Sequence, residues 1–571
     1  MTGADRAVED PRADLRWGSI PAMVADAGRR FGEAEALVEG DAHWPFAGLT
    51  AASVQFTRAL LASGVGPGDR VGLWAPNCAE WVVAALGTLG AGAVLVPVNT
   101  RFKGPEAAYV LGSSRARLLC TVQGFLGVDY PGLLEGEDLP DLAEVVTLRR
   151  EGHPQRVCPA PIIELDEFLH RSEQVPPADA EAVAAAVGPD DVSDIIYTSG
   201  TTGRPKGAMA THGQTLRTFG TWSSIVGLTE GDRYLVVNPF FHTFGYKAGV
   251  LACLMTGATI VPEPVFDPGR VLERIEHEHI SVLPGPPTLY QALLDHPDRQ
   301  SRDISSLRLG VTGAAVVPVE LVVAMREELG FSTVLTAYGL TESTGTVTMC
   351  RRDDPPELVA TTSGRALPDL EVQVVAAEGA ERPRGLPGEI VVRGYTVMPG
   401  YFEDEAATKA AVDAFGWLHT GDIGVMDEDG NVTVTDRLKD MYTVGGFNAY
   451  PAEIEAALRR CTDVAQVAVV GVPDERLGEV GCAYVVLSDG GPDDAAGREA
   501  AARRLLERCR ETMANYKVPR HVVVVDELPL NASGKVLKVE LRRRFAVGAD
   551  PVVTAQRSGS GQSHNGARRS P

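Results

Sequence analysis

A loop rich in glycine and hydroxyl groups holds the densest set of residues that could do chemistry. Residues Tyr197–Ala208 read YTSGTTGRPKGA, with three glycines, four Ser or Thr side chains and two cations. Glycines let the backbone approach a ligand closely, while N–H and O–H donors and positive charge bind the oxygens of a phosphate chain. The loop lacks the GxxxxGK[ST] order of a P-loop NTPase, because Lys206 lies between Pro205 and Gly207. The sequence therefore predicts a phosphate-binding loop of a different type, since a flexible linker would not need this order of glycine and lysine.

Four further side chains could act on a ligand, and each also has an ordinary structural explanation. Tyr338, beside a glycine in AYGLTE, could stack on a purine, and Glu342 could hold a hard cation that bridges phosphates. By itself Tyr338 could be a core tyrosine, and Glu342 would more often be a solvated glutamate. His242, in the aromatic segment NPFFHTFG, is either a buried histidine or a site residue. Lys247 either meets a carboxylate in a substrate pocket or extends its ammonium to solvent.

The elements that must position these residues form an α/β pattern. From about Ser19 to Ile423, Ala- and Leu-rich helical stretches alternate with short apolar runs, which are typical of buried parallel strands. The expected strands are Arg70–Trp74, Ala93–Pro97, Leu118–Val122, Ile260–Pro262, Val282–Pro284 and Leu307–Thr312.

Two later regions have different patterns. Shorter strands joined by Gly, Asp and Glu turns predict a β-rich subdomain that closes the large unit. Its expected strands are Leu370–Val375, Gly388–Arg393, Gly424–Met426 and Val432–Thr435. A compact α+β unit should follow Asp436, with helices Ala452–Leu458 and Ala500–Met513 and strands Val464–Val472, Ala483–Leu487 and His521–Val525.

Composition narrows the functional classes. In 571 residues, 53 Lys and Arg against 76 Asp and Glu give a net charge of −23, which disfavours nucleic acid as a partner. The eight cysteines contain no CxxC pair, so reduced thiols in the cytoplasm fit best. The polar, acidic N-terminus does not resemble a signal peptide. The uncharged run Trp81–Val98 contains three glycines, which predict a buried helix, a turn and a strand and not a membrane span.

Seven motifs in register make the chain resemble the superfamily of acyl- and aryl-CoA synthetases, peptide-synthetase adenylation domains and luciferases. The resemblance extends from about residue 20 to residue 545. The motifs are Thr198–Gly207, Asn238–Gly245 (NPFFHTFG), Val311–Ala315 (VTGAA) with Thr336–Glu342 (TAYGLTE), Trp417–Asp422 (WLHTGD), Asp436–Asp440 (DRLKD), Gly445–Glu455 (GGFNAYPAEIE) and Pro529–Lys535 (PLNASGK).

The resemblance implies a role for each matched residue. It implies catalytic roles for Lys535, Glu342, Thr198 and His242, with Glu342 as the Mg²⁺ ligand. It implies ATP or CoA binding by Thr198, Ser199, Gly200, Thr201, Thr202, Gly203, Lys206, Gly313, Ala314, Ala315, Tyr338, Gly339, Thr341, Asp422, Arg437, Lys439, Gly445, Gly446 and Phe447. Where the family often has Arg, three residues after the catalytic lysine, this chain has Lys538.

The resemblance also implies an architecture and a reaction. We expect an α/β fold with a large N-terminal domain of stacked mixed sheets and helices, a β-rich subdomain and a small mobile α+β C-terminal domain. The expected limits are a disordered N-terminus at 1–18, an AMP- and acyl-binding domain at 19–436, a hinge at 437–440, the mobile domain at 441–545 and a disordered tail at 546–571. The implied reaction is AMP-forming acyl-CoA ligation of a carboxylic acid through an acyl-adenylate, with ATP, CoA and Mg²⁺. A homo-oligomeric state is left open.

Several segments are most similar to the actinobacterial ligases that activate the propanoate side chain of a partly degraded steroid nucleus. These segments are NPFFHTFGYKAG, VLPGPPTLYQALLDHP, RLKDMYTVGGFNAYPAEIE and GVPDERLGEVG. The alternatives are a short- or medium-chain fatty acyl-CoA ligase, a freestanding adenylation enzyme that loads a carrier protein, and a luciferase-type oxidase. A binding protein without activity is disfavoured, because both Lys535 and Glu342 are present.

Overall fold

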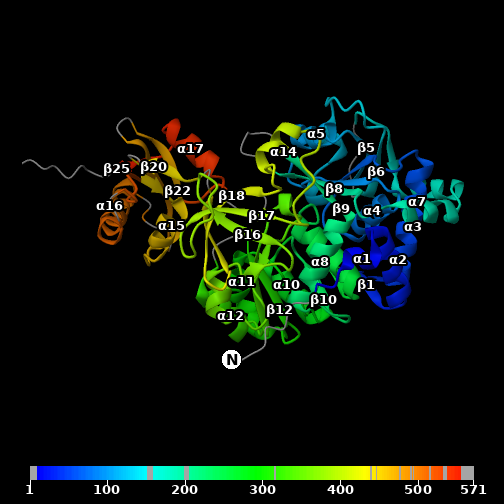
Figure 1. Ribbon diagram of the computed structural model, residues 1–571, viewed down its shortest axis with the longest axis horizontal. Helices are drawn as coiled ribbons and strands as arrows, with labels where there is room; N and C mark the ends of the chain where they lie inside the picture. The colour runs from blue at the N-terminus through cyan, green and yellow to red at the C-terminus, as the bar shows by residue number, and fades with distance from the viewer. Residues whose placement is uncertain are drawn as a thin grey trace, which may run out of the picture. The chain divides into compact units, whose positions relative to one another are not determined.

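The computed structural model in Figure 1 describes residues 10–150, 158–198, 205–313, 317–437, 440–444, 447–474, 477–488, 492, 494–513, 516–530 and 536–554. The chain divides into two compact units. The first comprises Met1–Thr420 and Val425–Val434, and the second comprises Gly421–Gly424 and Thr435–Pro571. Each unit is described by itself.

A seven-stranded sheet forms the first layer of the first unit, with the order β7-β6-β5-β3-β4-β8-β9. All neighbours pair in parallel except β8 and β9, which form an antiparallel hairpin. The strands are β3 (Arg70–Trp74), β4 (Val94–Pro97), β5 (Ala116–Gln123), β6 (Glu144–Arg150), β7 (Ile162–Glu164), β8 (Val192–Thr198) and β9 (Lys206–Thr211). The apolar runs at residues 70–74, 93–97 and 118–122 are therefore confirmed as parallel strands.

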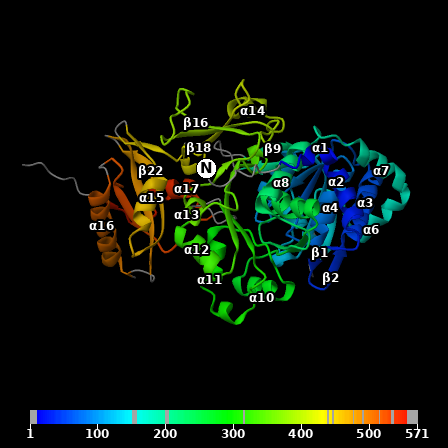
Figure 2. The ribbon, with the colours of Figure 1, turned by 60° about the horizontal axis from the view of Figure 1, so that its bottom comes forward.

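The uncharged run Trp81–Val98 forms most of helix α4 (Ala79–Gly90), a turn and strand β4, as the glycines predicted. No helix among the described residues is long and apolar enough to cross a membrane. Helix α4 packs against α3 (Phe46–Ala62) and α2 (Ile20–Phe31), and these three helices lie together in Figure 2. The remaining helices of the first unit are α1 (Ala13–Trp17), α5 (Gly104–Ser113), α6 (Leu165–His170), α7 (Pro177–Ala186), α8 (His212–Val226), α9 (Ala252–Thr256), α10 (Pro268–Glu278), α11 (Pro287–Leu294), α12 (Val319–Glu327), α13 (Pro356–Thr361) and α14 (Glu405–Ala411).

Two further sheets follow the orders β10-β11-β1-β2 and β12-β13-β14-β15. Their strands are β1 (Glu35–Glu39), β2 (Ala42–Pro45), β10 (Arg233–Val236), β11 (Thr259–Pro262), β12 (Leu309–Gly313), β13 (Thr333–Tyr338), β14 (Thr348–Met349) and β15 (Arg365–Ala366). The strand expected at Val282–Pro284 is only a single bridging residue, because Val282 pairs with both Tyr234 and Leu309 before a Gly-Pro-Pro segment begins. Proline has no N–H to continue a ladder.

The β-rich subdomain is a sheet of order β16-β17-β18-β19, with strands β16 (Glu371–Val375), β17 (Gly388–Arg393), β18 (Leu418–Met426) and β19 (Val432–Arg437). Strand β18 begins six residues before the expected position at Gly424, so most of the WLHTGD motif lies within a strand. Leu418 and Met426 are buried with Ile390 and Val432 in a core of this subdomain. That core explains why the strand extends through polar residues.

The second unit contains a sheet of order β21-β20-β23-β24-β25, in which β22 also pairs with β23. Its elements are β20 (Tyr442–Val444), β21 (Phe447–Ala449), α15 (Pro451–Arg459), β22 (Val464–Asp474), β23 (Gly478–Leu487), α16 (Ala495–Thr512), β24 (His521–Val524), α17 (Lys538–Ala546) and β25 (Val553–Thr554). The α+β pattern expected from the sequence is confirmed. Two separate apolar clusters, which include Val469 and Val470 respectively, form because successive strand residues point to opposite faces.

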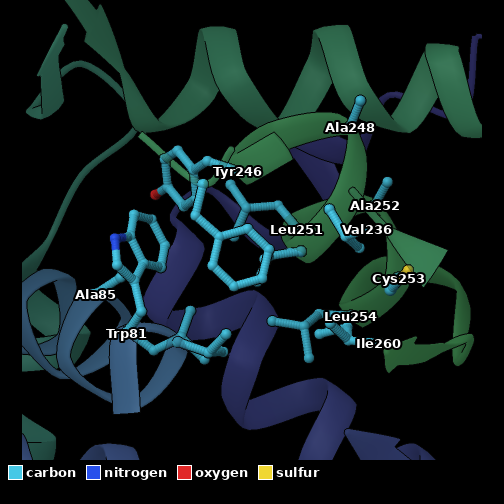
Figure 3. Close-up of a cluster of buried hydrophobic side chains, with 14 of the residues drawn as sticks. Trp81, Ala85, Val236, Tyr246, Ala248, Leu251, Ala252, Cys253, Leu254 and Ile260 are labelled. Atoms are coloured by element: carbon cyan, nitrogen blue, oxygen red, sulfur yellow. The ribbon is translucent and has the colours of Figure 1, made fainter. Parts of the chain in front are cut away.

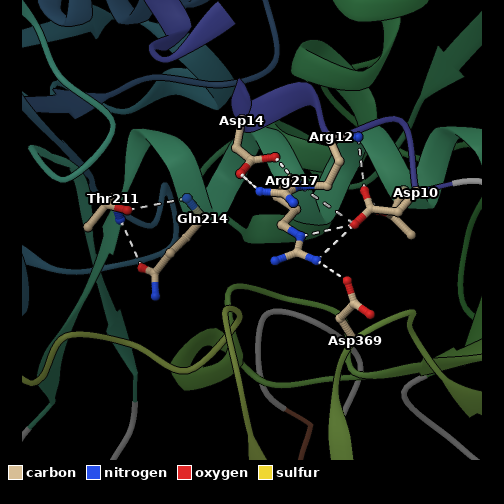
Figure 4. Close-up of polar contacts among 8 residues, drawn as sticks. Asp10, Arg12, Asp14, Thr211, Gln214, Arg217 and Asp369 are labelled. Atoms are coloured by element: carbon tan, nitrogen blue, oxygen red, sulfur yellow. Dashed lines mark hydrogen bonds and ion pairs between the residues drawn. The ribbon is translucent and has the colours of Figure 1, made fainter. Parts of the chain in front are cut away.

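Both ends of the chain contain structure where disorder was expected. In Figure 4, Arg217 on α8 contacts Asp10 and Asp369, with a nitrogen–oxygen distance of 2.9 Å to Asp10, and α1 begins at Ala13. At the other end, β25 pairs with β24. The expected disordered segments 1–18 and 546–571 are therefore wrong for residues 10–18 and 546–554, because long-range pairing that local composition does not reveal orders them. Residues 1–9 and 555–571 lie outside the described residues.

Candidate functional site

The β8–β9 hairpin positions the two ends of the expected phosphate loop. Thr198 ends β8 and Lys206 begins β9, and the two residues are paired in the ladder. Helix α5 supports the hairpin, because the Tyr109 hydroxyl donates to the Pro205 carbonyl at 3.0 Å and the Ser113 hydroxyl donates to the Tyr197 oxygen at 2.9 Å. The central loop residues lie outside the described residues: Ser199, Gly200, Thr201, Thr202 and Gly203.

A carboxylate lies directly beside the base of this hairpin. The hydroxyl groups of Thr198 and Tyr401 both donate to Oε1 of Glu342, at 3.0 Å and 2.9 Å. The Lys206 ammonium lies 5.2 Å from the centre of the Tyr401 ring. We call these four residues the Glu342 cluster. Burial, followed by the charge of Glu342, raises the pKa of Tyr401, so its hydroxyl stays protonated and remains a donor.

Tyr401 was missed in the sequence analysis. It reaches Glu342 because residues 400–402 run along β9: the Met209 N–H donates to the Gly400 carbonyl and the Phe402 N–H donates to the Gly207 carbonyl. The Tyr401 N–H is also satisfied, by the Thr408 hydroxyl at 2.9 Å. Neither the spacing nor the composition around residue 401 signals this contact.

The expected adenine-binding residues lie at the ends of two parallel strands. Strand β12 ends at Gly313 and strand β13 ends at Tyr338, and Gly313 is level with Ala337 in the register. The half-buried Tyr338 is followed by Gly339, where a Cβ atom would lie 2.3 Å from the Gly345 carbonyl oxygen. Only glycine fits there.

The next turn holds Thr341 and Glu342 in a short 3-10 helix, Thr341–Ser343. Residues Tyr338 to Glu342 are thus brought together by one strand end and one turn. Ala314 and Ala315 lie outside the described residues.

His242 precedes η4 (Phe244–Leu251), which is a π-helix. The imidazole is half-buried, its ring centre lies 4.8 Å from that of Phe241, and the described residues provide it no hydrogen-bond partner. Burial lowers the pKa of His242 to about 4. The ring is therefore neutral near pH 7.

The environment of Lys247 on η4 matches neither of the two alternatives that the sequence left open. Its side chain is 1% exposed, so the ammonium does not reach solvent, and its carboxylate partner is Asp194 of β8, at 2.9 Å. A second bond connects Lys247 to the Thr215 hydroxyl on α8, at 3.2 Å. Burial lowers the pKa of Lys247, and the neighbouring Asp194 opposes that shift by favouring the charged form. The sequence analysis did not identify Asp194 as this partner.

The motif residues near and within the second unit are only partly described. Asp422 is buried on β18, and Arg437 ends β19, although its side chain lies outside the described residues. Phe447 begins β21, and again only its backbone is described. Lys538 begins α17 and forms an ion pair with Glu455 at 3.0 Å. Also outside the described residues are Lys439, Gly445, Gly446 and Lys535.

Comparison with known proteins identifies the class to which this fold and site belong. The AMP-binding enzyme family matches residues 24–402, and the AMP-binding enzyme C-terminal domain matches residues 453–535. The chain belongs to the AMP-binding enzyme family. This confirms the resemblance and the α/β fold class with a large N-terminal and a small C-terminal domain.

Relatives define the reaction more closely. The chain is 49% identical to "3-[(3aS,4S,7aS)-7a-methyl-1,5-dioxo-octahydro-1H-inden-4-yl]propanoyl:CoA ligase" of Rhodococcus jostii, over 92% of this chain and 98% of the relative. It is 48% identical to the Mycobacterium tuberculosis protein of the same name, over 93% and 99%. The crystal structure of the anthranilate CoA ligase AuaEII with anthranoyl-AMP is similar, with a TM-score of 0.80 and 29% identity over 94% of this chain and 99% of that one. The protein is an AMP-forming acid:CoA ligase, which uses a carboxylic acid, ATP and CoA.

Proposed function

We propose that the acid is the bicyclic diketone propanoate in the relatives' name, 3-[(3aS,4S,7aS)-7a-methyl-1,5-dioxo-octahydro-1H-inden-4-yl]propanoate. The observation that carries this proposal is 49% identity over nearly the whole length of a ligase named for that acyl group. A second relative supports it at 48% identity. By contrast, the human medium-chain acyl-CoA ligase is 33% identical to this chain.

In the first half-reaction, a carboxylate oxygen of the acid attacks the α-phosphorus of ATP. A new P–O bond forms, the bond from the α-phosphorus to the bridging oxygen breaks, and pyrophosphate leaves. The phosphate loop from Thr198 to Lys206 holds the phosphate chain with hydroxyl, backbone and ammonium groups, and Lys535 stabilises the charge that develops at the α-phosphate. Thr198 supports this role because its hydroxyl connects the loop to Glu342 at 3.0 Å.

The Glu342 cluster fits a magnesium ion held mainly by the nucleotide. Mg²⁺ commonly takes one or two carboxylates together with substrate phosphates and water. Glu342 provides one carboxylate, already oriented by Thr198 and Tyr401, at the base of the phosphate hairpin. Bound there, the ion would neutralise phosphate charge, while Thr198 and Tyr401 fix the direction of the carboxylate.

The nucleoside is proposed to bind where β12 and β13 end. Tyr338 would stack on the adenine, with the backbone of residues 313–315 and 339–341 lining its edge. Asp422 would accept hydrogen bonds from the ribose hydroxyls, and Arg437 would donate to the same sugar. These roles are proposed because the residues match the family's motifs.

In the second half-reaction, the thiol of CoA releases its proton to solvent and its sulfur attacks the acyl carbon, and AMP leaves with the electrons of the broken C–O bond. We propose that the small domain rotates about Lys439 between the two steps, which withdraws Lys535 and brings in the CoA-binding loop Gly445–Phe447. His242, neutral because burial lowers its pKa to about 4, would lie beside the acyl group without adding charge there.

A cytoplasmic location is part of the same proposal. All eight cysteines are free, and all but Cys158 are buried. Free buried thiols are typical of proteins from a reducing compartment.

A panel of acids tests the proposed substrate. CoA-dependent AMP release is measured with the bicyclic diketone propanoate and with straight-chain acids of similar carbon number. We expect kcat/KM for the bicyclic acid to be higher by at least about tenfold, because a pocket that fits a rigid ring system discriminates against a flexible chain. Equal or higher values for a straight-chain acid would replace the proposal with a fatty acyl-CoA ligase. Acid-dependent pyrophosphate release without formation of a CoA thioester would instead indicate a carrier-loading enzyme.

A further inference from the structure

The ion pair between Lys247 and Asp194 lies in the interior of the first unit. Both side chains are 1% exposed, and the Nζ–Oδ1 distance is 2.9 Å. The other carboxylate oxygen accepts the Ser193 hydroxyl at 2.7 Å, and the ammonium also donates to Thr215 at 3.2 Å. Every charged atom of the pair is therefore directed toward a specific partner.

The pair connects the two elements that flank the phosphate loop. Asp194 lies on β8, four residues before Thr198, where the loop starts. After the loop, β9 leads directly into α8, whose N-cap is Thr211 and which carries Thr215. One ammonium group thus contacts both the strand that enters the phosphate hairpin and the helix that leaves it.

The same ammonium group comes from η4, which begins at the end of residues 238–245. We call these residues the acyl-side segment, because the proposed function assigns them to the acyl group. Lys247 lies on η4, five residues after His242, and π-helical turns are often found at functional sites. On either side of Lys247 in the sequence, η4 is packed in apolar surroundings. Figure 3 shows Tyr246 and Leu251 among buried side chains around Trp81, whose ring centre lies 5.5 Å from that of Tyr246.

Stability alone does not account for such a pair. Two charges lose their water when they are buried, and a well-packed apolar pair of similar size is often as stable or more stable. What an ion pair adds is direction, because its contacts form only when η4, β8 and α8 present Lys247, Asp194 and Thr215 to one another.

We propose that the Lys247–Asp194 pair is a positioning device that sets the acyl-side segment 238–245 relative to the phosphate hairpin. The pair does not touch the reacting atoms. It holds the segment that carries His242 at a fixed position from the place where the α-phosphate binds, so that the carboxylate of the acid is aligned for attack. This inference rests on the proposed function, which assigns the segment to the acyl group.

The main test is the double variant Asp194→Leu/Lys247→Met, which replaces both charges by apolar groups of similar size. Pyrophosphate release is measured with varied acid and with varied ATP. We expect kcat/KM for the acid to fall by roughly 10- to 100-fold through a higher KM, because a displaced segment loses contacts with the bound acid, and one methylene contact in an apolar pocket is worth about 10- to 200-fold. The KM for ATP should stay within about twofold, since Tyr109 and Glu342 still hold the hairpin. Unchanged acid kinetics in a folded double variant would overturn the proposal.

A smaller change keeps the test decisive if the double variant does not fold. Thr215→Val removes only the bond from Lys247 to α8, and it should raise the KM for the acid by about 2- to 10-fold. Its matched control is Thr218→Val on the same helix, because Thr218 is equally buried and its hydroxyl has no partner among the described residues. The same kinetic change in both Thr variants, or in neither, would contradict the proposal.

The proposed function can fail separately from this inference. If the wild-type protein activates another acid and not the bicyclic one, the substrate assignment is wrong, and the variants are then compared with the acid that is activated. The positioning role is then overturned by the same outcomes as above, measured with the acid that is activated.

Discussion

Two polar clusters lie along the same strand, β8, and they differ in whether the carboxylate is paired with a cation. At Asp194, a carboxylate and an ammonium are both excluded from water and are paired at 2.9 Å. At Thr198, the neighbouring carboxylate of Glu342 is half-buried and is contacted by two hydroxyl groups, and no cation forms an ion pair with it among the described residues.

The difference supports the two proposed roles, positioning for the Lys247–Asp194 pair and cation binding for Glu342. A charge that is already matched in a dry interior has little left to offer a ligand, but it fixes the elements that carry it. A carboxylate that is oriented by neutral donors keeps its charge available for a cation. Removal of the first should act through the fold and the alignment of the acid, and removal of the second should act on the chemical step.

The largest expected effect is on stability. Lys247→Met alone leaves Asp194 as an unpaired buried charge, which should lower the free energy of unfolding by about 3–5 kcal/mol. Urea unfolding followed by tryptophan fluorescence measures the loss. The double variant Asp194→Leu/Lys247→Met should recover most of it. If the double variant were as unstable as the single one, charge matching would not be the reason for the pair.

Glu342→Gln should have the next largest effect, on the rate of pyrophosphate release. The amide keeps the size of the side chain but removes the charge, so we expect a loss of about 100-fold in kcat, comparable with removal of one electrostatic contact in a transition state. Because the amide oxygen can still accept from Thr198 and Tyr401, the free energy of unfolding should change by less than about 1 kcal/mol. The Mg²⁺ concentration that gives half of the maximal rate should also rise. A normal rate with normal Mg²⁺ dependence would contradict the proposed role of Glu342 in binding Mg²⁺.

Tyr401→Phe should have a smaller effect on the same step. It removes one of the two donors to Glu342 and leaves the other, which should cost about 0.5–1.5 kcal/mol, or about a 2- to 10-fold loss of rate. Tyr234→Phe is the matched control, because its hydroxyl is buried without a hydrogen-bond partner among the described residues. Equal effects of the two substitutions on the rate would show that the hydroxyl of Tyr401 does not orient Glu342.

The smallest expected effect is the pH dependence of stability near neutrality. Burial, with a contribution from the charge of Lys247, lowers the pKa of His212 to about 4, and its Nδ1 accepts the Ile20 N–H. The unfolded state, with a histidine pKa of about 6.5, binds more protons below neutrality, so stability falls as the pH decreases toward 4. From pH 7 to pH 6 the contribution of His212 to this loss should be less than about 1 kcal/mol. His212→Asn should reduce this slope in thermal melts without abolishing it, since His242 also has a pKa of about 4. An unchanged slope would show that His212 is not held neutral.

Local sequence predicted the parts of the fold and site that depend on neighbouring residues. Apolar runs identified β3, β4 and β5, and the AYGLTE motif placed Tyr338 and Glu342 together because they lie on one strand end and the following turn. Resemblance to the family supplied the reaction, which no spacing of residues could have given.

The contacts that the sequence did not reveal are long-range. Tyr401 is 59 residues from Glu342, and it reaches the carboxylate only because residues 400–402 run along β9. Lys247 is 53 residues from Asp194, so its partner could not be distinguished from a substrate or from solvent before the fold was known. In both cases the missing information was sheet and helix packing, not chemistry.

The most direct test of this account is to measure pyrophosphate release for the wild type, Glu342→Gln and Asp194→Leu/Lys247→Met with acid and ATP varied independently. The account predicts that Glu342→Gln lowers kcat at saturating acid and leaves the KM for the acid nearly unchanged. It predicts that the double variant raises the KM for the acid and leaves the KM for ATP nearly unchanged. If both variants changed the same constant by the same factor, the two clusters on β8 would not have separate roles, and the central claim would be contradicted.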